Sequence, residues 1–159
     1  MVNRSFMAIV AVVVTALGNL LLYAGCRSHE GDENQLREDV DSFATYYYNW
    51  HFDRALRYCT PSSEQWLRYM ASNVGDEDVD SLRGGEEDAS VEIMGIVYHG
   101  NGDSATVRVC VANFLQMDSI GKSLHRVGNA IFCLPAVIHE GRWKVRMDSP
   151  LRSGRQSRG

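Results

Sequence analysis

The densest group of chemically reactive side chains is the acid-rich stretch Gly75–Asp88. It holds seven acids and one arginine. Four of the acids match positions 1, 3, 5 and 12 of a calcium-binding loop: Asp76, Asp78, Asp80 and Glu87. Ser81 stands where the sharp turn of such a loop needs glycine, and a predicted strand follows in place of a helix. The pattern therefore favours a solvated loop, and we expect neither a metal nor a cofactor.

Cys26 ends an N-terminal segment that has the features of an export signal. Arg4 precedes an apolar run over residues 6–23, and Ala24 and Gly25 place small residues directly before the cysteine. The sequence becomes polar immediately after it. The apolar run is also about long enough to span a bilayer, so an uncleaved transmembrane anchor is the alternative.

The run Tyr23-Ala24-Gly25-Cys26 resembles the lipobox of bacterial lipoproteins, in which leucine is preferred at the position of Tyr23. The resemblance implies a lipoprotein signal peptide over residues 1–25, acylation of the Cys26 sulfur, and a tether over residues 26–34. Each buried methylene of an acyl chain contributes about 0.8 kcal/mol, so two or three chains anchor a domain firmly. The expected location is the cell envelope, on the periplasmic or outer surface of a membrane.

The remainder of the chain has the size and charge of one acidic domain. About 130 residues follow the signal segment, which is enough for a single core. All 20 acids and all but one of the 16 basic residues lie after position 25. An acidic balance argues against a nucleic-acid-binding surface. The exception is the stretch 149–159, a basic tail of small polar residues that we expect to be disordered.

The first half of the domain is predicted to be helical. Apolar residues recur with helical spacing at Leu36, Val40, Phe43 and Tyr47. Two shorter helices are expected at residues 52–58 and 61–73. The aromatic cluster over residues 46–52 is interpreted as packing between these helices, and its His51 has no neighbours at metal-ligand spacing.

The second half is predicted to form a four-stranded antiparallel meander. The expected strands are residues 89–98, 105–116, 124–138 and 143–147, joined by tight turns at 100–103 and 139–142. Val107, Val109 and Val111 alternate with polar residues, which indicates a central strand with one buried face. Pro135 predicts a bulge or break in the third strand.

The apolar faces of the central strands suggest a specific register. Pairing Val111 with Phe132 makes one face apolar, and the fourth strand continues this face with Val145 opposite Ala136 and Trp143 opposite Ile138. The same register places Cys110 opposite Cys133, within or slightly beyond the reach of a disulfide. An oxidising compartment would allow the bridge, and two packed thiols are the alternative.

Helices followed by a curved sheet define an α+β fold, and its closing strand Gly141-Arg142-Trp143-Lys144-Val145 resembles that of NTF2-like domains. The resemblance covers residues 35–148 and includes small bacterial lipoproteins. It implies N-terminal helices packed on a four-stranded sheet that curls into a cone with a pocket. The candidate pocket residues are Tyr47, Trp66, Tyr98, Asn113 and His125.

The first functional interpretation is a non-catalytic lipoprotein whose NTF2-like domain binds a small ligand or an unidentified protein partner. The second is an isomerase-like or dehydratase-like enzyme with Glu92, His99 or His125 as a base in the cone, but no catalytic pair is evident. The third is a transmembrane-anchored assembly subunit of a secretion system. The resemblance also suggests a homodimer through the open face of the sheet, with Thr106, Arg108 and Phe114 as candidate contacts.

Overall fold

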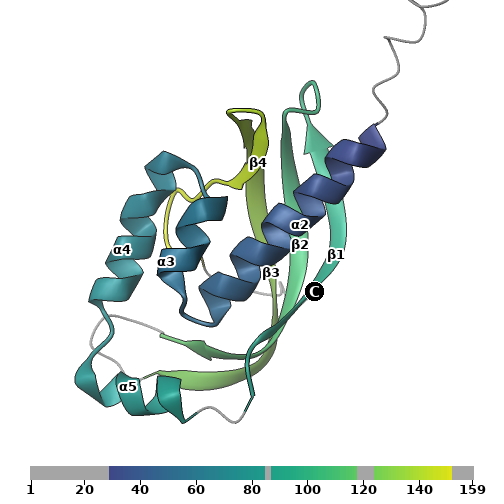
Figure 1. Ribbon diagram of the computed structural model, residues 1–159. Helices are drawn as coiled ribbons and strands as arrows, with labels where there is room; N and C mark the ends of the chain where they lie inside the picture. The colour runs from purple at the N-terminus through teal and green to yellow at the C-terminus, as the bar shows by residue number, and fades with distance from the viewer. Residues whose placement is uncertain (1–28, 85–86, 118–123, 152–159) are drawn as a thin grey trace, which may run out of the picture. The chain divides into compact units, whose positions relative to one another are not determined.

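The computed structural model describes residues 29–84, 87–117 and 124–151 (Figure 1). The predicted signal peptide, Cys26 and residues 152–159 of the predicted basic tail lie outside these residues, whereas residues 29–34 of the predicted tether belong to helix α2 (His29–Tyr48). The chain divides into two units, 1–33 and 34–159, and the account below concerns the second. Within the described ranges, no helix has both the length and the apolar composition needed to cross a membrane.

The predicted helical half is present. Its elements are α2 (His29–Tyr48), α3 (Phe52–Ala55), η2 (Leu56–Tyr58), η3 (Pro61–Ser63) and α4 (Glu64–Ser72). The predicted apolar stripe is confirmed, because Leu36, Val40, Phe43 and Tyr47 are all buried. From Asn34 onward, α2 lies across one face of the sheet, with α3 and α4 beside it (Figure 1). This arrangement gives the domain its single core.

The acid-rich stretch is not the solvated loop that its composition predicted. Residues Asp76–Arg83 form helix α5. Asp78 is buried, and its carboxylate accepts hydrogen bonds of 3.0 Å from the backbone N–H groups of Gly75 and Leu124. Acids in the first turn of a helix are stabilised by the helix dipole, which explains why this acidic segment is helical and not a loop. Asp78 thus links α5 to the start of the third strand.

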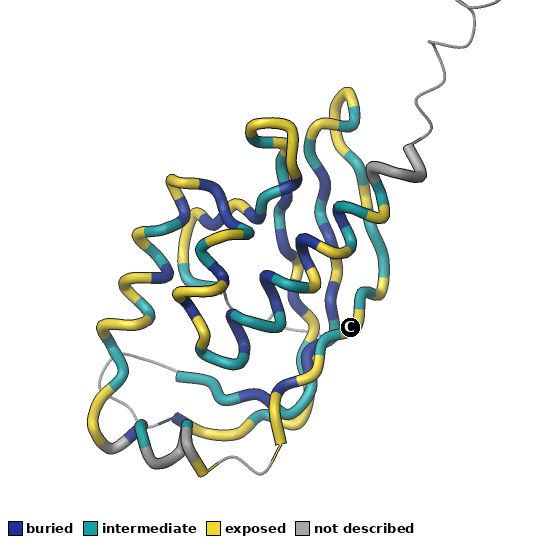
Figure 2. Tube along the Cα trace, viewed as in Figure 1, coloured by how far each residue is buried: buried dark blue, intermediate teal, exposed yellow. Residues whose placement is uncertain are grey.

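The sheet confirms the predicted α+β class and strand order. Its strands are β1 (Ser90–His99), β2 (Ser104–Gln116), β3 (His125–His139) and β4 (Arg142–Val145), in the order β1-β2-β3-β4. All neighbours are antiparallel. Figure 2 shows exposed positions at the hairpin tips and buried positions along the strands and α2.

The predicted register between β2 and β3 is wrong by two residues. Val111 pairs with Ala130 and Val109 pairs with Phe132, although the same side chains remain on the buried face. Cys110 therefore faces Ile131, and Cys133 faces Arg108. Both thiols are free, so the possible disulfide between them is not formed in this structure. Diagonal positions across a strand pair are usually too distant for a bridge.

Pro135 causes no break in β3, contrary to expectation. It pairs with Thr106 in an uninterrupted ladder. On the other side, its carbonyl accepts a 2.8 Å hydrogen bond from the N–H of Arg146, just beyond the end of β4. Because the N and O atoms of a strand residue point the same way, the missing N–H faces the place where β4 ends. The proline therefore costs the sheet little.

Candidate binding site

The turn after α2 forces an aromatic residue into a strained backbone conformation. Trp50 has φ of 61°, in the left-handed region that bulky residues rarely adopt. The N–H of His51 donates a hydrogen bond to the carbonyl of Tyr46, and the N–H of Trp50 donates one to the carbonyl of Tyr47. These are the two bonds of a Schellman motif, whose left-handed position is usually glycine. The indole N–H also donates to the carbonyl of Leu115 at 3.2 Å, which fixes the ring.

A second strained residue interrupts β2. Asn113 has φ of 57°, and the buried positions change there from the odd-numbered Val107, Val109 and Val111 to the even-numbered Phe114. Phe114 thereby enters the core, so its predicted role on the open face of the sheet is wrong. Strained non-glycine residues are often found at functional sites, and both of these residues line the same surface feature.

An apolar hollow lies at the C-terminal end of α2. Its unfilled space is about 380 Å³, part of it open to solvent. The ring of Tyr48 packs against Phe132 and Phe114, with centroid distances of 4.6 and 5.5 Å. The lining residues are Tyr47, Tyr48, Trp50, Phe52, Met70, Phe114, Leu115, Gln116, Met117, Phe132 and Leu151. Among the described residues, this lining contains no acid, histidine, lysine or arginine.

A polar hollow adjoins the apolar hollow and shares four residues with it: Tyr48, Trp50, Phe114 and Leu115. Its remaining lining is largely polar and includes Asn49, Glu87, Asp88, Asn113 and Arg126. Nη1 of Arg126 donates to the backbone carbonyl of Asn113 at 3.0 Å and to Oδ1 of Asn113 at 2.9 Å. The two hollows together therefore present an apolar surface beside a charged one.

Asn49 fixes the edge of the polar hollow. Its Nδ2 donates to the carbonyl of Ala89 at 3.1 Å, and its Oδ1 accepts from the N–H of Ala89 at 2.8 Å. This amide pairs with the backbone as a neighbouring strand would. The segment that carries Asp88 into β1 is thereby held against the end of α2.

The hydroxyl group of Tyr48 is the least satisfied polar group of the site. Tyr48 is 5% exposed, and its hydroxyl is buried with no hydrogen-bond partner in the part of the chain that the structure describes. The neighbouring Tyr47 hydroxyl accepts a 3.2 Å hydrogen bond from the N–H of Leu151. Burial raises the pKa of Tyr47 to about 12 and the pKa of Tyr48 well above its ordinary value. Both hydroxyls therefore stay protonated at neutral pH.

Two of the five predicted pocket residues line these hollows. Tyr47 lines the apolar hollow and Asn113 lines the polar one. Trp66, Tyr98 and His125 line neither. Trp66 packs against Tyr69, Tyr98 packs against Trp143, and His125 is exposed. Sequence reasoning missed Tyr48 and Trp50, although both belong to the aromatic cluster interpreted there as packing.

The described residues do not support the calcium-loop match. Among them, no group of three or more acidic, histidine or cysteine side chains is placed to hold a metal ion. Asp76, Asp78 and Asp80 belong to helix α5, whereas calcium-loop ligands need an irregular turn. Glu87 lies beyond that helix, at the polar hollow.

Comparisons with known proteins identify no relative. No protein-family model, curated protein or solved structure matches the chain.

Proposed function

We propose that this protein is a membrane-anchored lipoprotein of the cell envelope whose NTF2-like domain binds a small amphipathic ligand without catalysing a reaction. The observation that carries the proposal is that Tyr48 lines both hollows while its buried hydroxyl has no hydrogen-bond partner among the described residues. A buried hydroxyl without a partner costs about 1–3 kcal/mol. A ligand that forms a hydrogen bond with it would remove that cost.

The lining of the apolar hollow supports binding rather than the isomerase or dehydratase alternative. Such enzymes need a base next to the apolar pocket. The three candidate bases lie elsewhere: Glu92 and His125 are exposed, and Nε2 of His99 lies 2.9 Å from Oγ1 of Thr106. A tyrosine with a raised pKa serves as a hydrogen-bond donor and not as a base.

The anchor part of the proposal rests on the lipobox-like run that ends at Cys26. Lipid attachment would hold the domain at a membrane surface, where amphipathic molecules are concentrated. The assembly-subunit alternative requires instead that the apolar run at residues 6–23 be retained. The α+β fold is compatible with a lipid anchor and with a transmembrane anchor. Whether Cys26 is acylated distinguishes these two alternatives.

Ligand binding in the apolar hollow can be tested with methyl-labelled methionines in the full-length protein. Met70 and Met117 line the hollow, whereas Met94 is 47% exposed in β1 and lines neither hollow. On titration with 4-phenylbutanol, we expect saturable chemical-shift changes at the methyl groups of Met70 and Met117. The methyl group of Met94 should not respond. Shifts of similar size at all three methyl groups, or none at Met70 and Met117, would contradict the proposal.

A further inference from the structure

The polar hollow carries a net negative charge. Glu87 and Asp88 contribute two exposed carboxylates, and Arg126 contributes one guanidinium. Nη1 of Arg126 also lies 3.4 Å from the backbone carbonyl of Glu87, in addition to its bonds to Asn113. Among the described residues, the carboxylate of Glu87 receives only a 3.3 Å hydrogen bond from Nδ2 of Asn113. A carboxylate is therefore left available at the edge of the hollow.

The lining of the polar hollow adds two features that suit a cation. It includes the aromatic residues Tyr48, Trp50 and Phe114, and aromatic faces attract positive charge. Tyr48 is also more than nine-tenths buried, and its hydroxyl oxygen has no hydrogen-bond partner among the described residues. An ammonium group has three hydrogen-bond donors and no acceptor, so it could donate to this oxygen and to a carboxylate at the same time.

We propose that the polar hollow binds the primary ammonium group of an amphipathic amine, whose apolar portion occupies the adjoining apolar hollow. This inference rests on the proposed ligand-binding function and adds the chemical class of the ligand. Glu87 and Asp88 attract the ammonium group, and the Tyr48 hydroxyl accepts one of its hydrogen bonds. The shared residues Trp50 and Phe114 contact the ligand where its polar and apolar parts meet.

The test compares three probes that share an apolar portion and differ in the head group: 4-phenylbutylamine, 4-phenylbutanol and 4-phenylbutyrate. We expect the full-length protein to bind the amine about fivefold more tightly than the alcohol, and the carboxylate more weakly than both. The double variant E87Q/D88N should bind amine and alcohol with equal affinity. Because both residues are exposed, the variant should fold normally.

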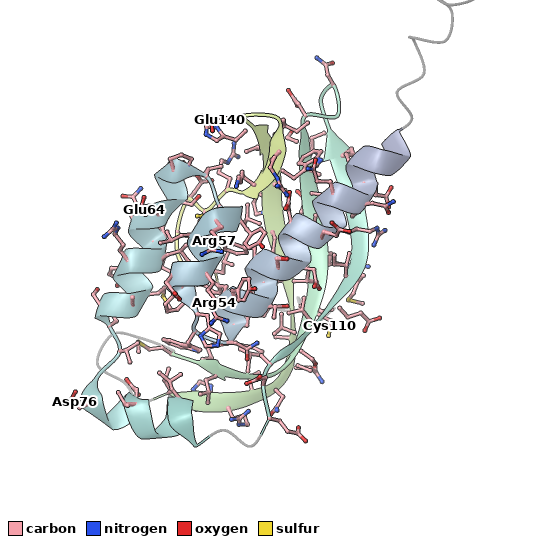
Figure 3. The ribbon with its side chains drawn as sticks, in the orientation of Figure 1. Arg54, Arg57, Glu64, Asp76, Cys110 and Glu140 are labelled. Carbon is pink, nitrogen blue, oxygen red and sulfur yellow. The ribbon has the colours of Figure 1, made fainter. Side chains whose placement is uncertain are left out.

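Asp76→Asn provides the matched control. Asp76 is an exposed acid at the start of α5, on the outside of the domain, and it lines neither hollow (Figure 3). This variant loses one negative charge but should keep the preference for the amine. Equal loss of the preference in D76N and E87Q/D88N would show a general effect of net charge and overturn the proposal.

The remaining outcomes separate this inference from the function on which it rests. If the alcohol binds in the apolar hollow and the amine binds no more tightly, the ammonium proposal fails and the ligand-binding function stands. Tightest binding by 4-phenylbutyrate would assign recognition to Arg126 and also overturn the inference. If none of the three probes binds, both proposals fail.

Discussion

Replacing Cys26 by alanine is expected to abolish the acylated form of the protein. In a bacterial host, the unaltered chain should be extracted with detergent as a species that begins at Cys26 and carries acyl groups. The variant lacks the sulfur on which the proposed acylation depends and should lose the added mass entirely. The change in mass should therefore be close to all-or-none. Intact-mass spectrometry of the detergent extract measures it.

Ser28→Ala is the control for the anchoring experiment, since Ser28 lies two residues after the cysteine and outside the lipobox-like run. Its mass should show the same acylation as the unaltered chain. A mass that includes residues 1–25 in both the unaltered protein and the Cys26 variant would contradict the lipoprotein assignment. That result would favour a transmembrane anchor and the assembly-subunit alternative.

Replacing Asp78 by alanine is expected to lower the free energy of unfolding by about 3 kcal/mol. The buried carboxylate accepts hydrogen bonds from the N–H groups of Gly75 and Leu124, and alanine would leave both donors without this partner. Hydrogen bonds to a charged group are worth about 1.5–3 kcal/mol each, and relief of the desolvated charge offsets part of the loss. Unfolding in urea, followed by circular dichroism, measures the difference.

Asp76→Ala is the matched comparison, because it removes an exposed acid from the same helical turn. It should change stability by no more than about 0.5 kcal/mol. Asp78→Asn keeps one acceptor oxygen and should fall between the two. Equal stability of D78A and D76A would show that the carboxylate does not link α5 to β3. Added calcium should stabilise none of these proteins.

The periodic parts of the chain could be predicted because their patterns repeat over many residues. The stripe from Leu36 to Tyr47 specifies a helix with one buried face, and the alternation from Val107 to Val111 specifies a strand. Periodicity also predicted the pairing of Ala136 with Val145 and of Ile138 with Trp143. The two-residue turn between β3 and β4 leaves little freedom there.

The register between β2 and β3 could not be predicted from the pattern. A shift of two residues returns every side chain to the same face of the sheet, so the apolar pattern is satisfied equally in both registers. The shift changes only which residues lie directly opposite each other. The predicted pairing of Cys110 with Cys133 was therefore wrong, although the predicted buried face was correct.

The site could not be predicted from the sequence because it depends on two residues whose backbone conformations are unusual for their residue types. Trp50 occupies a backbone position that normally selects glycine, and Asn113 reverses the alternation of β2. Neither exception has a signature in the sequence, since tertiary contacts compensate for the strain. The missing partner of the Tyr48 hydroxyl likewise becomes visible only when α2 is packed on Phe114 and Phe132.

The most direct test of ligand binding is the effect of Tyr48→Phe on affinity and stability in the same protein. Removing an unpartnered hydroxyl should raise the free energy of unfolding by about 1 kcal/mol and weaken binding of 4-phenylbutanol about fivefold. Tyr47→Phe should instead lower stability, because the N–H of Leu151 loses its acceptor. Unchanged affinity in Y48F, or a clear loss of its stability, would contradict the view that this hydroxyl is kept for a ligand.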